Sequence, residues 1–217
     1  MAKVTAPLLS MGARGQIGGS MVLAKWRGID YARQYVKPAN PRTEAQQANR
    51  ARFALLREMH KLAPGPLRDP WDAFAKGRPF TGVNKFVGEN NRVLNGETDM
   101  TLFIASPGAA GGVPPQAVSG AEGSGAGEVD VTVTVTDQLP TGWTVFAVAA
   151  SAFVQQDPTG YFTGPLVAGT VAAPGDTVTL SGLPETGDIV VQGWVIYSKP
   201  DGSKAYSVSL SDTVTLA

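Results

Sequence analysis

Hydrophobic and polar residues alternate along much of the C-terminal half of the chain. Valine occupies positions 129, 131, 133 and 135, and Asp or Thr stands at each position between them. A period of two places such valines on one face of a strand, toward a core. Further β-rich runs follow at 143–154, 177–183, 188–198, 204–211 and 213–217, with turn signals between them. About seven short strands predict an all-β sandwich of the immunoglobulin or fibronectin type III kind over residues 129–217, with Trp194 in its core.

The first strands of the chain are predicted on either side of a turn at Arg27-Gly28. Glycines at 12, 15, 18 and 19 precede them and indicate bulges or a close backbone contact. The period of two places four side chains of the second strand on one face: Ile29, Tyr31, Arg33 and Tyr35.

Helical periodicity begins after the prolines at 38 and 41, which favour an extended backbone. Thr43 and Gln46 have the spacing of a capping box, and apolar residues then recur at 45, 48, 55, 59 and 62 until Pro64-Gly65-Pro66. Asp69 and Pro70 predict the start of a second helix, a third is predicted over 83–94, and residues 100–106 are predicted as a strand. Residues 1–105 therefore predict an α+β domain with a small sheet and two or three helices.

The stretch between these two parts has a different composition. Residues 106–128 are rich in Gly, Ala, Pro and Ser, and they lack a periodic apolar pattern. Such a segment buries too little surface to offset the entropy lost on ordering it. We therefore predict a linker over 106–128, between an anchoring domain over 1–105 and a sandwich over 129–217.

Net charge differs between the two predicted domains, although the whole chain is neutral. Residues 1–105 contain 16 Lys and Arg against 8 Asp and Glu, and residues 106–217 contain 2 against 10. The resulting +8 and −8 predict different partners for the two halves, or contact between halves of neighbouring copies in a homo-oligomer or lattice. Two ordinary solvated surfaces of opposite charge are the alternative.

Candidate catalytic chemistry is sparse. The chain has no cysteine and one histidine, His60, which we interpret as a structural residue near the C-terminus of a helix, where a cation is favoured. The Gly-rich start has no Lys in the P-loop position, and the Asp-Gly turns are too short for a calcium loop. We expect no enzyme, no cofactor and no metal site. The N-terminal stretch lacks a signal-peptide core and no apolar run reaches about 20 residues, so no membrane contact is expected.

The strand-to-helix junction supplies the candidate binding residues. Arginine is enriched in protein interfaces and neutralises phosphates in nucleic-acid sites, and aromatic side chains anchor interfaces of both kinds. Both partner classes stay open, as does a merely solvated face. The interface candidates are Trp26, Arg27, Tyr31, Arg33, Tyr35, Arg42, Arg50 and Arg57.

Several pieces of the N-terminal half occur in an order that resembles structural proteins of tailed phages and prophages. They are a Gly-rich start, KWRG, YVKPANPRTEAQQANR and GVNKFVGENN, between Gly12 and Asn91. The resemblance implies a non-enzymatic virion component, assembled in the bacterial host cytoplasm, with other capsid or tail proteins as partners. We expect a minor capsid or decoration protein that anchors through residues 1–105 and projects the sandwich.

Two alternatives come from other classes. One is a tail or head–tail junction component that contacts DNA through the Arg-rich helix. The other is a carbohydrate-binding module that stacks sugars on Trp143, Tyr161 and Phe162, although core packing is the ordinary role of such side chains.

Overall fold

The computed structural model describes residues 3–4, 13–26, 29–37, 39–109, 112–135, 139–160, 164–173 and 175–217. The fold is mixed α+β and rich in β-strands, as predicted. The chain divides into two compact units, residues 1–42 and residues 43–217. We call them unit 1 and unit 2 and describe each by itself.

Unit 1 is a four-stranded antiparallel sheet in the order β1-β2-β3-β4. Its strands are β1 (Lys3–Val4), β2 (Ala13–Ile17), β3 (Met21–Trp26) and β4 (Ile29–Gln34). The predicted hairpin is confirmed as β3 and β4, which pair from Met21↔Gln34 to Trp26↔Ile29. The Gly-rich approach forms β2 and its turn, with positive φ at Gly18 and Gly19, a conformation that glycine adopts without strain.

Unit 2 begins with three helices and one short 3-10 turn. They are α1 (Glu44–Leu62), α2 (Gly65–Ala75), α3 (Gly82–Val93) and η1 (Met100–Leu102). Thr43 is the N-cap of α1 as expected, but its side chain makes no capping hydrogen bond. The predicted start of α2 at Asp69 is wrong: Pro64 is the N-cap and Pro66 lies in the first turn, where its missing N–H is not needed, so Pro70 lies inside the helix.

The remaining strands of unit 2 form two antiparallel sheets. One contains β5 (Ala117–Glu122), β6 (Val129–Thr134) and β9 (Thr177–Leu180), in the order β5-β6-β9. The other has the order β11-β10-β7-β8, and β12 also pairs with β10. Its strands are β7 (Thr144–Val154), β8 (Leu166–Val171), β10 (Gly187–Ser198), β11 (Lys204–Tyr206) and β12 (Leu210–Leu216).

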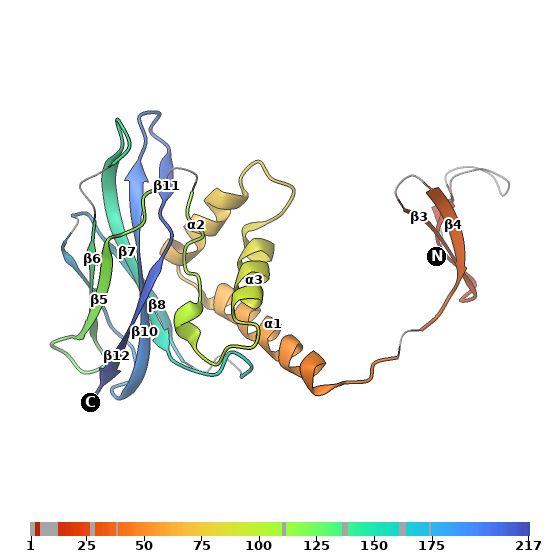
Figure 1. Ribbon diagram of the computed structural model, residues 1–217, viewed down its shortest axis with the longest axis horizontal. Helices are drawn as coiled ribbons and strands as arrows, with labels where there is room; N and C mark the ends of the chain where they lie inside the picture. Colours follow the sequence, from red (N-terminus) through yellow and green to blue (C-terminus); the bar gives the residue numbers. More distant parts are fainter. Residues whose placement is uncertain are drawn as a thin grey trace. The chain divides into compact units, whose positions relative to one another are not determined.

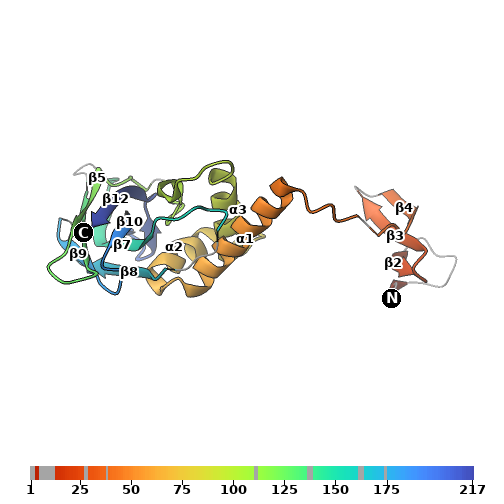
Figure 2. The ribbon, with the colours of Figure 1, turned by 90° about the horizontal axis from the view of Figure 1, so that it is seen from below.

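The five-stranded sheet is the middle layer of unit 2, and it is buried on both faces. On β10, Val190 and Trp194 belong to the core that also contains helix residues such as Leu55 and Phe86, whereas Val191 and Val195 belong to the core shared with β6 and β9. Figures 1 and 2 show the three helices on one side of this sheet, and the β5-β6-β9 sheet on the other. Alternate side chains of one strand therefore join the helices and the second sheet into one body.

This arrangement corrects the predicted domain boundaries. Residues 43–105 do not form a domain with the β1–β4 sheet, because their buried apolar faces pack on the C-terminal sheet. Trp194 is buried as predicted, but it faces the helices.

The described residues of the segment predicted as a linker, 106–109 and 112–128, are also part of folded unit 2. Ser106 and Pro115 are buried, and residues 117–122 form β5, which pairs with β6 along its whole length. Small residues suit this place because Gly120 packs against Val191 and Val214, where a Cβ would come within 2.9 Å of both side chains. The small side chains of β5 therefore allow close packing against β10 and β12, and they do not indicate a flexible linker.

The strand predicted over 100–106 is wrong for a related reason. Residues 100–102 form η1, and the next residues are held by side chains: Asn90 accepts a hydrogen bond from the Ile104 amide at 2.6 Å and donates one to its carbonyl at 3.1 Å. The Ala105 amide donates to Gln192 Oε1 at 2.9 Å and to Ser209 Oγ at 3.0 Å. Side chains thus form the hydrogen bonds that these backbone N–H and C=O groups would otherwise make with a neighbouring strand.

None of the helices among the described residues is long and apolar enough to cross a bilayer.

Candidate interaction surfaces

One face of the unit 1 sheet combines arginine, aromatic and aliphatic side chains. The register pairs Val22 with Arg33, and Ala24 with Tyr31, so these four residues share a face. Gln16 pairs with Val22, which places Gln16 and Arg14 on the same face. We call this set of residues the basic face: Arg14, Gln16, Val22, Ala24, Tyr31 and Arg33.

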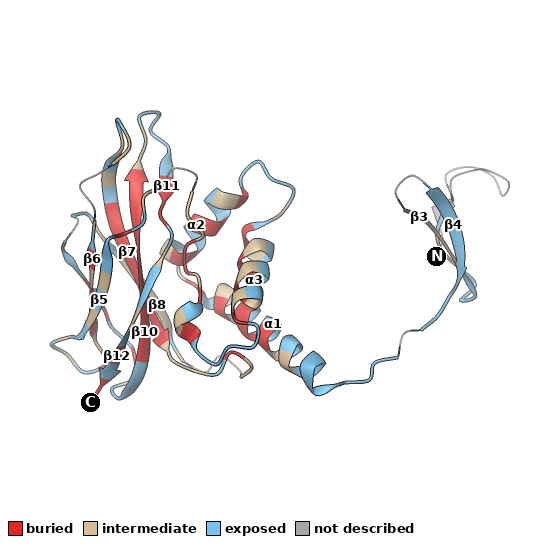
Figure 3. Ribbon diagram, in the orientation of Figure 1, coloured by how far each residue is buried: buried red, intermediate tan, exposed pale blue. Residues whose placement is uncertain are grey.

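Among the described residues of unit 1, no second layer covers either side of its sheet. Every residue of 14–37 whose burial is described is exposed or half-buried, as the pale ribbon in Figure 3 shows. Tyr31 is 41% exposed and Ile29 is 68% exposed, and on the opposite face Ile17 and Met21 are each 46% exposed. A sheet normally buries at least one apolar face against another layer. Apolar side chains left open on a sheet indicate a surface that binds another molecule.

The structure brings part of the predicted interface together. Tyr31 and Arg33 lie on the basic face, and β4 is followed directly by Tyr35, whose amide donates to the Ser20 carbonyl at 2.7 Å. Trp26 ends β3, where its backbone pairs with Ile29, but its side chain and the whole of Arg27 lie outside the described residues. Arg42 is the last residue of unit 1 and has a positive φ of 48°.

The two other predicted arginines, Arg50 and Arg57, lie on α1 in unit 2. Both are exposed, and Phe53 between them is 49% exposed on the same side of the helix. The first two turns of α1 have no buried residue, whereas Leu55, Leu56 and Met59 are fully buried (Figure 3). The apolar stripe therefore starts later than predicted, and Ala45 and Leu62 at its predicted ends are exposed.

Arg52 differs from its neighbours because it is only 4% exposed. Its guanidinium donates to Asn95 Oδ1 at 2.9 Å and to the Asn91 carbonyl at 3.4 Å, while its Nε has no partner. This arginine joins α1 to the end of α3 and is unsuited to contact DNA.

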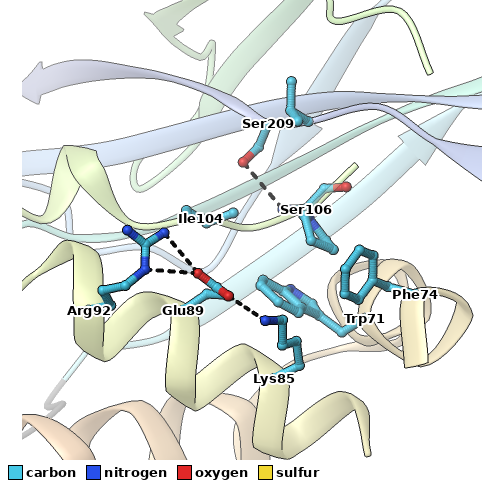
Figure 4. Close-up of a pocket in the computed structure, with 10 residues that line it drawn as sticks. Trp71, Phe74, Lys85, Glu89, Arg92, Ile104, Ser106 and Ser209 are labelled. Atoms are coloured by element: carbon cyan, nitrogen blue, oxygen red, sulfur yellow. Dashed lines mark hydrogen bonds and ion pairs between the residues drawn. The ribbon is translucent and has the colours of Figure 1, made fainter. Parts of the chain in front are cut away.

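A half-open cavity of about 410 Å³ lies in unit 2 between α2, α3 and residues 104–107 (Figure 4). Trp71 and Phe74 form one wall, and the Trp71 Nε1–H donates to the Ala105 carbonyl at 2.7 Å. Glu89 on the opposite wall binds Lys85 and Arg92, and hydrogen bonds from these two cations lower the pKa of its carboxyl group. Because both cations are already paired with Glu89, the cavity presents a mainly apolar surface.

No group of three His, Cys, Asp or Glu residues among the described residues is placed to hold a metal ion. His60 packs edge-on against Phe86 with ring centroids 5.1 Å apart. Burial, followed by the charge of Arg68, lowers the pKa of His60 below its ordinary value of 6.5. The interpretation of His60 as structural thus fits its contacts. The expectation that a protonated His60 is favoured at this helix end is wrong, because the lowered pKa disfavours the charged form.

The residues of the carbohydrate alternative are only partly described. Trp143 is half-buried, with its ring 5.8 Å from the Tyr197 ring and 5.2 Å from Lys199 Nζ. Tyr161 and Phe162 lie outside the described residues, so that alternative stays a prediction.

Sequence reasoning missed the cavity and the exposed Phe53. The cavity depends on contacts between α2, α3 and residues 208–209, which are far apart in the sequence. Phe53 carries a usable signal, because it stands off the apolar stripe of a helix between two exposed arginines.

The comparisons with known proteins extend over both units. No curated protein matches the chain. The model of a family of unknown function, DUF6266, matches residues 12–157, about two thirds of the chain. The match includes β2–β4 of unit 1, all three helices and β5–β7, so it runs through the segment predicted as a linker. The chain therefore belongs to the DUF6266 family, whose function is unknown.

Proposed function

We propose that this chain is a non-enzymatic structural protein that inserts its unit 1 sheet into a larger assembly. The observation that carries the proposal is a four-stranded sheet with exposed apolar side chains on both faces. Small sheets gain independent stability from a buried face, and this one has none among its described residues. A partner that covers Ile29 and Tyr31 supplies the missing layer.

The assembly that we propose is a tailed-phage virion, with the chain as a minor capsid or decoration protein. The support is the resemblance of residues 12–91, a segment that covers most of unit 1 and the three helices. Other virion proteins are the proposed partners, and the chain is present in many copies. In this arrangement unit 1 anchors and unit 2 faces outward.

We further propose that the two sheets of unit 2 form a sandwich of the immunoglobulin or fibronectin type III kind. Two antiparallel sheets around one core, with Val129 and Val131 opposite Val191, support this assignment. Sandwiches of this kind have many functions, so the fold alone selects none of them.

A second candidate function has one observation in its favour. Arg50, Phe53 and Arg57 form an exposed basic and aromatic stripe on α1, which suits a DNA-contacting protein at the head–tail junction. Replacing Arg50 and Arg57 with Ala should then weaken DNA binding and reduce its dependence on salt. A chain without measurable DNA affinity at low salt contradicts this candidate.

Localisation in purified particles tests the main proposal. We expect cryo-electron microscopy to show stoichiometric density for the chain on the particle, with the β1–β4 sheet in contact with a neighbouring protein. A variant with Tyr31→Asp and Arg33→Glu should be lost from particles, whereas a variant with Ala73→Asp and Lys76→Glu, which changes the net charge equally at exposed positions of unit 2, should be retained. If the chain is absent from particles, the virion role is wrong. If density shows unit 1 free in solvent, the docking role is wrong.

A further inference from the structure

The charge of unit 1 restricts the kind of surface that can cover its sheet. Residues 1–42 contain seven Lys and Arg against a single acidic residue, Asp30. Asp30 already forms an ion pair with Lys25, with 3.8 Å between Asp30 Oδ2 and Lys25 Nζ, and both side chains are well exposed. A second unit 1 is a poor partner, because two copies of unit 1, each with a net charge of +6, repel each other. The covering surface must therefore be acidic.

The basic face adds a geometric requirement. Arg14 and Arg33 stand on β2 and β4, with the half-buried Val22 and Ala24 on the strand between them and Tyr31 beside them. An apolar centre with charged margins is the usual composition of a protein interface. The matching surface needs carboxylates that are spaced along neighbouring strands.

Unit 2 of the same protein carries such a surface. Between Arg92 and Lys199 the sequence contains no Lys or Arg, and residues 43–217 together have 11 basic and 17 acidic residues. Five carboxylates, exposed or half-buried, lie where β5 ends, β6 begins and β10 begins. We call this set the acidic end: Glu122, Glu128, Asp130, Glu185 and Asp188.

The register places these carboxylates at one end of the two sheets. Glu122 pairs with Val129, next to Asp130, and the Leu183 amide donates to the Gly127 carbonyl at 3.1 Å, which joins the β5–β6 turn to the segment before β10. Lys199 lies beyond the other end of β10, about 36 Å along the strand from Asp188 at 3.3 Å per residue. No basic residue of 106–217 therefore neutralises the acidic end.

We propose that unit 1 of one copy docks through its basic face onto the acidic end of unit 2 in a second copy. The proposal rests on the docking role proposed above for unit 1, and it names the partner as this same chain. The contact joins two different surfaces, so it repeats head to tail and builds a ring or an open array. Charge attraction between exposed groups acts over about 30 Å at 0.01 M salt and about 3 Å at 1 M salt, so docking weakens as salt rises.

A pair of charge-reversed full-length chains tests the contact. The first chain carries Arg14→Glu and Arg33→Glu on the basic face, and the second carries Glu122→Lys and Glu185→Lys on the acidic end. A control chain carries Lys61→Glu and Lys76→Glu, which change the net charge as much as the first chain does but lie at exposed positions of unit 2, on α1 and directly after α2. Circular dichroism shows whether each variant keeps the fold.

Sedimentation velocity over a range of protein concentrations is the measurement. We expect the unmodified chain and the control to associate at about 20 mM salt. At about 500 mM salt, the dissociation constant of each should be at least about tenfold higher. Each charge-reversed chain alone should be largely monomeric, because the first has two acidic docking surfaces, and the acidic end of the second falls from five negative charges to a net charge of −1. An equimolar mixture of the two should form a heterodimer, because the unchanged basic face of the second chain then meets the unchanged acidic end of the first.

Three results overturn the proposal. They are a monomeric mixture, association of the first reversed chain equal to that of the unmodified chain, and a compact form that is independent of concentration, which indicates docking within one chain. These outcomes leave the particle experiment unaffected, since a unit 1 that binds a different acidic protein still appears buried in the particle.

Discussion

Replacing Trp71 with Phe tests whether the helices and sheets of unit 2 are one cooperative body. Trp71 is fully buried on α2, packs against Phe86 with centroids 5.4 Å apart, and donates its Nε1–H to the Ala105 carbonyl at 2.7 Å. Phenylalanine keeps most of the ring but leaves this buried carbonyl without a partner. The expected loss is about 1–3 kcal/mol of unfolding free energy from the unpaired group, with a smaller loss from the cavity. For a unit of this size, a loss of about 2 kcal/mol lowers Tm by about 4–8 °C.

Trp194 provides a matched control on β10. It is also fully buried, but its Nε1 has no hydrogen-bond partner, so Trp194→Phe removes volume without breaking a hydrogen bond. Chemical denaturation, followed by far-UV circular dichroism and by hydrogen exchange in β10, should show Trp71→Phe as the more destabilising change by about 1–3 kcal/mol.

Cooperativity provides the outcome that decides the question. If the helices belong to the same body as the sheets, both probes shift to the same lower midpoint in the Trp71→Phe variant. An early loss of helix signal, with the β10 midpoint unchanged, refutes the one-body description and restores a separate helical domain.

Three further changes test particular contacts by thermal or chemical unfolding. Asn90→Ala removes three hydrogen bonds, two of them to Ile104, and should cost about 2–4 kcal/mol, whereas an unchanged midpoint contradicts the role of Asn90 in holding residues 103–106. Gly193→Ala places a Cβ 2.6 Å from Val133 Cγ2 and should cost about 1–3 kcal/mol; a neutral result contradicts the face-to-face packing of the sheets. The pKa of His60 is lowered on folding, so below about pH 6.5 the unfolded chain binds a proton more readily than the folded chain. The free energy of unfolding should therefore fall as the pH drops below about 6.5, and His60→Gln should reduce that fall. Equal pH profiles of the two chains contradict the lowered pKa of His60.

Strands with strict alternation were predictable from the sequence. Residues 129–135 have valine at every second position and these valines pack in the core of unit 2, and β6, β7, β9 and β10 lie within or next to their predicted runs. The hairpin of β3 and β4 was also predictable, because two β-rich runs stand on either side of the turn signal at Arg27-Gly28.

β5 and β8 were missed because their sequences are small and weakly patterned. Gly120 in β5 and Gly169 in β8 stand where neighbouring side chains approach closely, a requirement set by residues far along the chain. Composition alone describes such a segment as a linker. The domain boundary failed for the same reason, since the partner of the helix faces lies in β7 and β10.

The sequence indicated which residues of the basic face are candidates for an interface, but it did not show which of the candidates lie together on one surface. Aromatic and arginine residues near a turn indicate an interface, and Tyr31 and Arg33 do lie on one exposed face. Arg50 and Arg57 belong to the other unit, and nothing in the local sequence shows that a unit boundary falls at Arg42. The acidic end was visible only as a net charge until the strand register grouped its carboxylates.

Hydrogen–deuterium exchange of unit 1, in the dilute chain and in the assembled particle, tests the central claim most directly. No second layer covers the β1–β4 sheet among the described residues of unit 1, so its amides should exchange rapidly in the dilute chain at high salt. In the particle, peptides from residues 13–37 should gain at least about tenfold protection as a partner covers the sheet, while peptides from β7 and β10 change little. Equal exchange of residues 13–37 in both states contradicts the docking role of unit 1.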